Sequence, residues 1–331
     1  MEELVKKLTE AYGPSGFEGR VRDMIAAEVK GLADEMRTDA LGNQFVLKKG
    51  KDRSKKAMLA AHMDEIGIMV THVDKNGFAR FTRLGGIFPL TLLGARVVFG
   101  NGIVGGIGVE RLEERSKIPE MDKMYIDVGA RDKESSPVKV GDAAGFSRPF
   151  VSQQGRWIAK AFDDRLGCAI LIETLRGLSK PACDTYFVFT AQEEVGVRGA
   201  TVAAFGVEPD FAIAVDVTGT GDTPECYPMA MELGKGPAIK VMDWGMLAHQ
   251  GLKNWMIKVA EEAGIPYQLE VLVFGSTDAM AIQSAREGVP SGVVSIPTRN
   301  VHSGCETVDE DDVRNSVKLL VELLSRQAEL D

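Results

Sequence analysis

The chain changes character twice along its length, and this change limits the folds that it can adopt. Up to residue 66 and again after residue 158, apolar residues recur with helical spacing or form short apolar runs, so helices and buried strands alternate. Between residues 67 and 158 helical periodicity almost disappears, and fourteen glycines fall there. Turns such as Asn76-Gly77 supply the positive φ values of tight hairpins. The sequence therefore predicts an α/β domain interrupted by a small antiparallel β-barrel or sandwich.

The two outer parts of the chain predict a single three-layer α/β/α domain, made of residues 1–66 and 159–331, with residues 67–158 as the inserted β domain. The 331 residues suit two domains of roughly 150 residues each. Ser15 followed by Glu18 has the pattern of a capping box and predicts the start of a helix. Helices are expected over 4–8, 15–30, 165–178, 196–205, 254–263, 277–287 and 309–327, and strands over 43–47, 56–61, 185–190, 211–217, 268–273 and 292–296.

Charge and hydropathy exclude several classes of partner. The chain has 39 Lys and Arg against 48 Asp and Glu, a net charge of −9, and no basic run for a phosphate backbone, so no nucleic acid is expected. Apolar runs stop at about five residues, whereas a membrane helix needs about 20, so no membrane association is expected. The charged start of the chain lacks an export signal, and the four cysteines form no CxxC pair. These features predict a cytoplasmic protein with reduced cysteines.

Side chains that bind metals lie at or just beyond the ends of five predicted elements. In an open α/β sheet the carboxyl ends of the strands form the ligand crevice, so these segments could converge. Two imidazoles with several carboxylates suit Zn²⁺, Co²⁺ or Mn²⁺. A carboxylate shared by two such ions would let them activate one water and stabilise an oxyanion, which is the chemistry of hydrolysis. The segments contain His62 with Asp64, Asp163 with Asp164, Glu193 with Glu194, Asp216, and His302.

Each segment also has a simpler interpretation. Asp163-Asp164 could be the charged start of a helix, and Glu193-Glu194 could be a solvated turn. Asp216 is harder to explain in this way, because it follows an apolar run and would be costly to bury without a partner. The occurrence of all five segments, each at a strand end, favours one metal site. Gly85-Gly86 has no helix after it, so it does not predict a phosphate loop.

Seven short motifs are spread along nearly the whole chain. They are Gly13-Pro-Ser-Gly16, Asp39-Ala-Leu-Gly-Asn43, Ala60-Ala-His-Met-Asp-Glu-Ile-Gly67, Asp163-Asp-Arg-Leu-Gly167, Gln192-Glu-Glu-Val-Gly196, Gly275-Ser-Thr-Asp-Ala279 and Ile296-Pro-Thr-Arg-Asn-Val-His302. With these motifs the sequence resembles the TET-type dinuclear metallo-aminopeptidases, a group that includes glutamyl aminopeptidases and proteins labelled cellulase M.

The resemblance implies a role for each candidate residue. Asp163 would bridge two divalent ions, zinc or cobalt with manganese as a further possibility. His62 and Asp216 would complete the coordination of one ion, and Glu194 and His302 would complete that of the other. Two further residues would be catalytic without binding metal: Glu193 as the general base, which takes a proton from the bridging water and returns it to the leaving amine, and Asp64, which would orient His62.

The resemblance also implies partners. Short peptides would be the substrates, and the β insert would be a dimerisation domain in a hollow tetrahedral dodecamer. Three alternatives stay open from the residues themselves: another two-metal amidohydrolase of deacylase or carboxypeptidase type, a glycoside hydrolase with an acid–carboxylate pair, and an assembly with a purely structural metal site. The preferred N-terminal residue of the substrate does not follow from the sequence.

Overall fold

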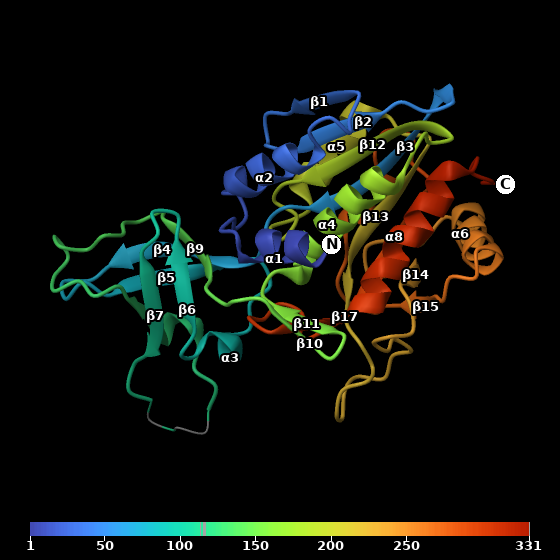
Figure 1. The fold of residues 1–331 in the computed structure, drawn as a ribbon. Coiled ribbons are helices and arrows are strands. Elements are labelled where there is room, and N and C mark those ends of the chain that lie inside the picture. The colour runs from blue at the N-terminus through green and yellow to red at the C-terminus, as the bar shows by residue number, and fades with distance from the viewer. Residues whose placement is uncertain (113, 115–116, 331) are drawn as a thin grey trace.

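The computed structural model describes residues 1–112, 114 and 117–330 of the chain. They form a large mixed sheet covered by helices, and a separate β-barrel that lies to one side of it (Figure 1). The helices are α1 Glu2–Glu10, α2 Gly19–Val29, α3 Pro89–Leu92, α4 Phe162–Gly177, α5 Arg198–Val207, α6 Gln250–Glu262, α7 Asp278–Gln283 and α8 Glu310–Ser325, with a 3₁₀ turn at Met121–Lys123.

The main sheet has eleven strands in the described residues. They are β1 Glu35–Thr38, β2 Gln44–Lys48, β3 Asp52–His62, β10 Val151–Gln153, β11 Arg156–Ala159, β12 Cys183–Thr190, β13 Phe211–Thr218, β14 Ala238–Met242, β15 Gln268–Val271, β16 Ser291–Arg299 and β17 Glu306–Asp309. The order is β1-β2-β12-β3-β13-β16-β17-β11-β10, and β14 pairs with both β15 and β16. Strands β12, β3, β13 and β16 are parallel neighbours at the centre.

The central strands are buried on both faces, which explains their continuous apolar sequences. Every residue of β13 is buried, as are the last six residues of β3. One face packs against α1, α2, α4, α6 and α8 around the largest apolar cluster of the described residues, and the other face packs against α5 and α7 around a second cluster rich in alanine. The predicted three-layer α/β domain is therefore confirmed.

The insert is a closed antiparallel barrel of six strands. Its own apolar core, which includes Phe81, Phe99 and Ile126, is separate from the core of the main sheet. The strands occur in the order β4-β5-β8-β7-β6-β9. They are β4 Gly67–Val73, β5 Ala79–Leu84, β6 Arg96–Phe99, β7 Val104–Val109, β8 Met124–Asp127 and β9 Ala143–Phe146.

Two features differ from the sequence interpretation. The barrel strands end at Phe146, and β10 and β11, which the sequence interpretation placed in the insert, pair through β11 with β17 of the main sheet. The capping box was wrong: α2 begins at Gly19 after Glu18, and the Ser15 hydroxyl donates its hydrogen bond to the Asp64 carboxylate instead. Among the described residues, no helix is both long and apolar enough to cross a membrane.

Candidate metal centre

The sheet brings the predicted site residues to one edge because its central strands run parallel. His62 is the last residue of β3, Glu193 and Glu194 follow β12 by three and four residues, and Asp216 lies near the end of β13. Asp163 lies in the irregular first turn of α4, and the peptide bond between Asp163 and Asp164 is cis. His302 follows β16 and completes the cluster, which draws on five segments far apart in sequence.

Asp163 lies at the centre of this cluster. Its Oδ1 is 2.9 Å from His62 Nε2, and its Oδ2 is 3.1 Å from His302 Nε2. The two oxygens of one carboxylate therefore face two different imidazoles.

The two adjacent glutamates lie next to this core. Glu194 Oε1 is 3.4 Å from His302 Nε2, and Glu193 Oε2 is 3.8 Å from His62 Nε2. Glu194 Oε1 is buried, and no hydrogen bond to it is found among the described residues. Ligand atoms of His62, Asp163 and Glu194 lie within 4.8 Å of one another, a spacing that a single ion can occupy.

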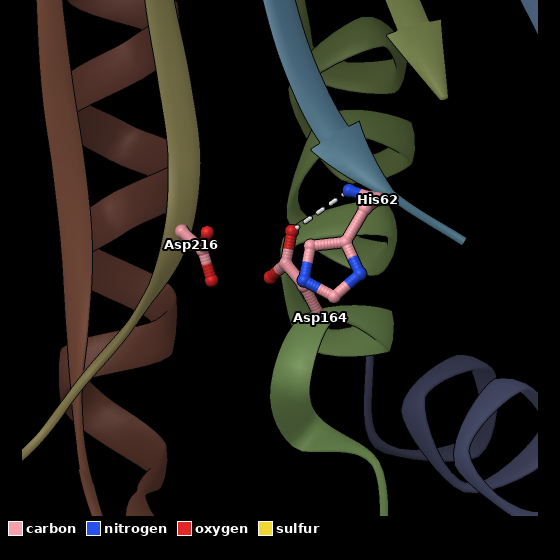
Figure 2. Close-up of side chains that lie close together, drawn as sticks. All are labelled: His62, Asp164 and Asp216. Atoms are coloured by element: carbon pink, nitrogen blue, oxygen red, sulfur yellow. Dashed lines mark hydrogen bonds between the residues drawn. The ribbon is translucent and has the colours of Figure 1, made fainter. Parts of the chain in front are cut away.

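Asp216 and Asp164 lie next to His62, and Figure 2 shows Asp216 facing the other two side chains. With His62 they form a second buried group whose ligand atoms also lie within 4.8 Å. Asp164 is already engaged, however: its Oδ2 accepts the backbone N–H of His62, and its Oδ1 accepts that of Gly167. Asp164 therefore fastens the start of α4 to the end of β3, which leaves Asp216 as the carboxylate of this group with more freedom to bind an ion.

Backbone carbonyls orient both imidazoles in the same way. His62 Nδ1 lies 3.0 Å from the carbonyl oxygen of Asp64, and His302 Nδ1 lies 2.7 Å from that of Gly86. A carbonyl oxygen only accepts, so each Nδ1 carries the proton and donates it. In a neutral imidazole the Nε2 lone pair is then free to bind a metal, and both Nε2 atoms face Asp163.

The carboxylate of Asp64 lies near His62 and also contacts the segment that carries Glu193 and Glu194. The Asp64 Oδ1 atom lies 3.5 Å from His62 Nδ1, whereas the backbone oxygen of Asp64 lies only 3.0 Å from the same nitrogen. The carboxylate also accepts the backbone N–H groups of Glu193 and Glu194, and the hydroxyl of Ser15. Asp64 therefore holds the segment that carries both glutamates.

The electrostatics of the cluster reflect several carboxyl groups that are buried close together. Burial and the charge of Asp163 raise the pKa of Asp216 well above its usual value, and the same two causes raise the pKa of Glu194. Burial also raises the pKa of Glu193, with Asp216 adding to the shift. Burial opposes protonation of His302, but Asp163 and Glu194 raise its pKa to about 12. A divalent cation would favour the ionised form of these carboxyl groups, so the donor set fits a metal ion.

Sequence reasoning missed one buried carboxyl group, Glu306, and gave no chemical role to a second, Asp278 of the Gly275-Ser-Thr-Asp-Ala279 motif. Glu306, at the start of β17, accepts the backbone N–H groups of Asp163 and His302. Asp278, at the start of α7, accepts the hydroxyl of Thr190 at the end of β12. Glu306 follows His302 by four residues, so a search for acids beyond each strand end could have found it. Of the other histidines, His72 is exposed on β4 and His249 caps α6, away from this cluster.

Comparison with known proteins identifies the family of this chain. The profile of the M42 glutamyl aminopeptidases matches residues 42–319. This chain belongs to the M42 glutamyl aminopeptidase family. A lysyl aminopeptidase of Pyrococcus furiosus is 37% identical over 345 residues, covering 99% of this chain and 98% of that protein. The M42 chain is therefore an aminopeptidase, and the purely structural alternative loses its support.

Solved structures of aminopeptidases have the same fold as this M42 chain. An aminopeptidase from the archaeon Desulfurococcus kamchatkensis has a TM-score of 0.95 at 40% identity, covering 98% of this chain and 94% of that one. A TET peptidase of Pyrococcus horikoshii, which can assemble into a tetrahedron or a large octahedral shell, has a TM-score of 0.89 at 33% identity. That match covers 98% of this chain and 99% of the other. The barrel and the mixed sheet are thus shared along their full length.

Proposed function

We propose that this M42 chain uses two divalent ions to remove N-terminal residues from short peptides. The observation that carries the proposal is the position of Asp163, whose two oxygens each face the Nε2 atom of a different histidine. A ligand that bridges two ions needs this arrangement, because each oxygen binds one ion. A site for one structural ion would not need a carboxylate shared between two imidazoles.

The other ligands divide between the two ions. His62 and Asp216 complete one ion with Asp163, and Glu194 and His302 complete the other. Asp164 is left out of the ligand set, because backbone N–H groups occupy both of its oxygens. Zinc or cobalt is the expected metal, with manganese as the next candidate, since the set combines two imidazoles with carboxylates and contains no thiolate.

Glu193 is the proposed general base. When bound, the two ions lower the pKa of the attacking water and stabilise the negative charge that develops on the peptide carbonyl oxygen. Glu193 Oε2 receives the proton of the water and later delivers it to the amine of the leaving peptide. The position of Glu193 supports this role. Its Oε2 lies 3.8 Å from His62 Nε2, which is too far for a hydrogen bond, so this oxygen is not engaged by His62. The Asp64 carboxylate accepts a hydrogen bond from the backbone N–H of Glu193 and so positions the base.

Two substitutions in adjacent residues test the proposal. Glu193→Gln keeps the size of the side chain and removes its basicity, so we expect both ions to stay bound while kcat falls about 10²–10⁴-fold. Glu194→Gln is the matched variant. It removes a ligand, so one ion should be lost and excess metal should restore part of the activity. Metal content by elemental analysis and kcat on aminoacyl-amides, with an N-acetylated peptide as the blocked substrate, give the result.

The opposite pattern would overturn the assignment. If Glu193→Gln lost an ion while Glu194→Gln kept both, the roles of the two residues would be exchanged. If Glu193→Gln retained normal turnover, it would not be the base. Cleavage of the N-acetylated peptide at the rate of the free peptide would favour a deacylase-like amidohydrolase instead.

Self-association is part of the proposal. The TET1 peptidase of Pyrococcus horikoshii can assemble into a tetrahedron or a large octahedral shell, and its structure matches 98% of this chain. We infer that the barrel is the dimerisation domain here, and that dimers assemble further into a tetrahedral dodecamer. The cytoplasm remains the location that the sequence predicts.

A further inference from the structure

The barrel reaches into the metal centre through the turn between β5 and α3. The carbonyl oxygen of Gly86 in this turn accepts the Nδ1–H of His302 at 2.7 Å, across 216 residues of sequence. The preceding residue, Gly85, lies against the other proposed ligand of the same ion, Glu194. Two neighbouring glycines of the inserted domain therefore contact two neighbouring metal ligands of the α/β domain.

Neither glycine leaves room for a side chain. A Cβ on Gly86 would lie 2.7 Å from His302 Nδ1 and 2.8 Å from Cε1 of the same ring. A Cβ on Gly85 would lie 2.8 Å from Glu194 Oε2 and 2.9 Å from Ile66 Cγ2. Gly85 also has a φ of +84°, which disfavours a side chain, whereas the φ of Gly86 lies outside the left-handed region. At Gly86, therefore, the close approach alone requires glycine.

His302 cannot move away from Gly86 without disturbing the site. Its backbone N–H is held by Glu306 at 2.9 Å, and its Nε2 lies 3.1 Å from Asp163. The imidazole is therefore fixed at its backbone and at both ring nitrogens. A Cβ at Gly86 would displace the ring and so change the distances from Nε2 to Asp163 and to Glu194.

We propose that the Gly85–Gly86 turn of the barrel positions the metal ligands His302 and Glu194, so that the inserted domain completes the peptidase site in its own subunit. The Gly86 carbonyl keeps the proton of His302 on Nδ1 and leaves Nε2 to the metal. The missing side chains let the turn approach both ligands. This proposal rests on the proposed function, because it takes His302 and Glu194 to bind one of two ions.

The test compares Gly86→Ala with Gly106→Ala in the full chain. Gly106 lies in β7 of the same barrel, and a Cβ there meets nothing within 4 Å, so this variant controls for an added methyl group. Zn²⁺ binding to the metal-free chains is measured by competition with a chromophoric chelator. We expect Gly86→Ala to bind one of the two ions about 10–100-fold more weakly, the usual effect of losing a partner that orients a ligand. Gly106→Ala should match the unmodified chain.

A second pair tests the contact with Glu194. Gly85→Ala introduces both the close approach and the strain of a positive φ, whereas Gly94→Ala introduces only the strain, since its φ is +70° and a Cβ would meet nothing within 4 Å. Weaker binding of one Zn²⁺ ion in Gly85→Ala, beyond any effect of Gly94→Ala, supports the proposal. Equal Zn²⁺ affinities in the two variants contradict a positioning role for Gly85.

His302→Ala separates this inference from the proposed function. If His302→Ala binds two Zn²⁺ ions as the unmodified chain does, the proposed ligand set is wrong. If His302→Ala loses one ion while Gly86→Ala and Gly106→Ala both bind two ions normally, the ligand set stands and the positioning role is wrong. A lower melting temperature of metal-free Gly86→Ala with unchanged Zn²⁺ affinity would show that the turn only packs, and would also overturn the proposal.

Discussion

At the scale of single residues, Glu306 links the backbones of two proposed ligands. Its Oε2 accepts the N–H of Asp163 at 3.1 Å, and its Oε1 accepts the N–H of His302 at 2.9 Å. Glutamine has one acceptor oxygen and an amide that donates, so it cannot replace both hydrogen bonds. Glu306 is fully enclosed, and burial with the charge of Asp163 raises its pKa to about 8.

This shift predicts an unusual pH dependence for the metal-free chain. A carboxyl group whose pKa is raised on folding binds its proton more tightly in the folded state. Its stabilising contribution is therefore present below the unfolded pKa, near 4, and is lost as pH rises through the folded pKa. Burial raises the pKa of Asp278 to about 6, so it adds in the same direction. The free energy of unfolding should thus fall as pH rises from 5 to 8.

Urea unfolding at several pH values, with a chelator present, measures this dependence. Glu306→Gln cannot titrate, so its stability should vary less steeply between pH 6 and 8 than that of the unmodified chain. The zinc-loaded chain serves as the control, since bound cations favour the ionised carboxylates. A metal-free chain whose stability rises with pH over this range would show that the carboxyl groups are not protonated in the folded state.

The site residues differ in how far sequence could predict them. His62, Asp163 and Asp216 were recognisable because each combines a metal-binding side chain with the end of a strand or the start of a helix. Gly86 gave no such signal. Gly86 acts through its carbonyl oxygen and its missing side chain, and it lies in a different domain. Contacts of this kind depend on the packing of one domain against another, which no local pattern encodes.

At the scale of secondary structure, Arg165 of α4 anchors the start of the chain. This side chain is fully buried, and it donates to the backbone carbonyls of Leu8, Ala11 and Gly13. It also lies 3.6 Å from Glu65, whose other oxygen binds Lys160. Helix α1 and the turn after it are thus held against the helix that carries the bridging aspartate.

Replacing this anchor should loosen the N-terminal segment. In Arg165→Lys a single ammonium group replaces the guanidinium group, whose nitrogens donate to three carbonyls. We expect the free energy of unfolding to fall by about 3–5 kcal/mol, as it does when other buried ionic contacts are broken. Arg176→Lys is the matched control on the same helix, because Arg176 is one-third exposed and pairs with Glu28 and Glu173 at the surface. It should change stability by less than about 1 kcal/mol. Urea unfolding gives both values.

Hydrogen exchange shows where the change occurs. Backbone amides of residues 4–17 should exchange faster in Arg165→Lys, whereas those of β13 should keep their protection until the whole chain unfolds. Equal stabilities for the two arginine variants would mean that α1 is held by its apolar contacts alone.

The order of the elements was largely predictable, and the exceptions have physical causes. Strands β3, β12, β13 and β16 have long apolar runs because they are buried on both faces. Strands β10 and β11 are short and partly exposed. They join the main sheet because β11 pairs with β17 from the far end of the chain, so nothing local assigns them to that sheet. Serine commonly caps helices, but the hydroxyl of Ser15 donates a hydrogen bond to the carboxylate of Asp64, 49 residues away in sequence.

At the scale of the whole molecule, the barrel is the part whose removal tests assembly. Replacing residues 67–146 by a short linker leaves β10 and β11 in the main sheet, where β11 pairs with β17. Because the barrel is the proposed dimerisation domain and has its own core, we expect the shortened chain to fold but to give a smaller particle than the intact protein. Multi-angle light scattering at micromolar concentration measures both masses. An intact chain that is monomeric at this concentration would rule out the barrel as an association domain.

The strand order also has a consequence for synthesis on the ribosome. Strands β2 and β3 follow one another in the chain, yet in the sheet β12 lies between them and pairs with both. The ribosome makes β12 only after the entire barrel, so the facing edges of β2 and β3 stay without their partner while the barrel emerges. His302 is made later still. The nascent chain therefore lacks the complete set of proposed metal ligands until nearly the whole polypeptide has been translated.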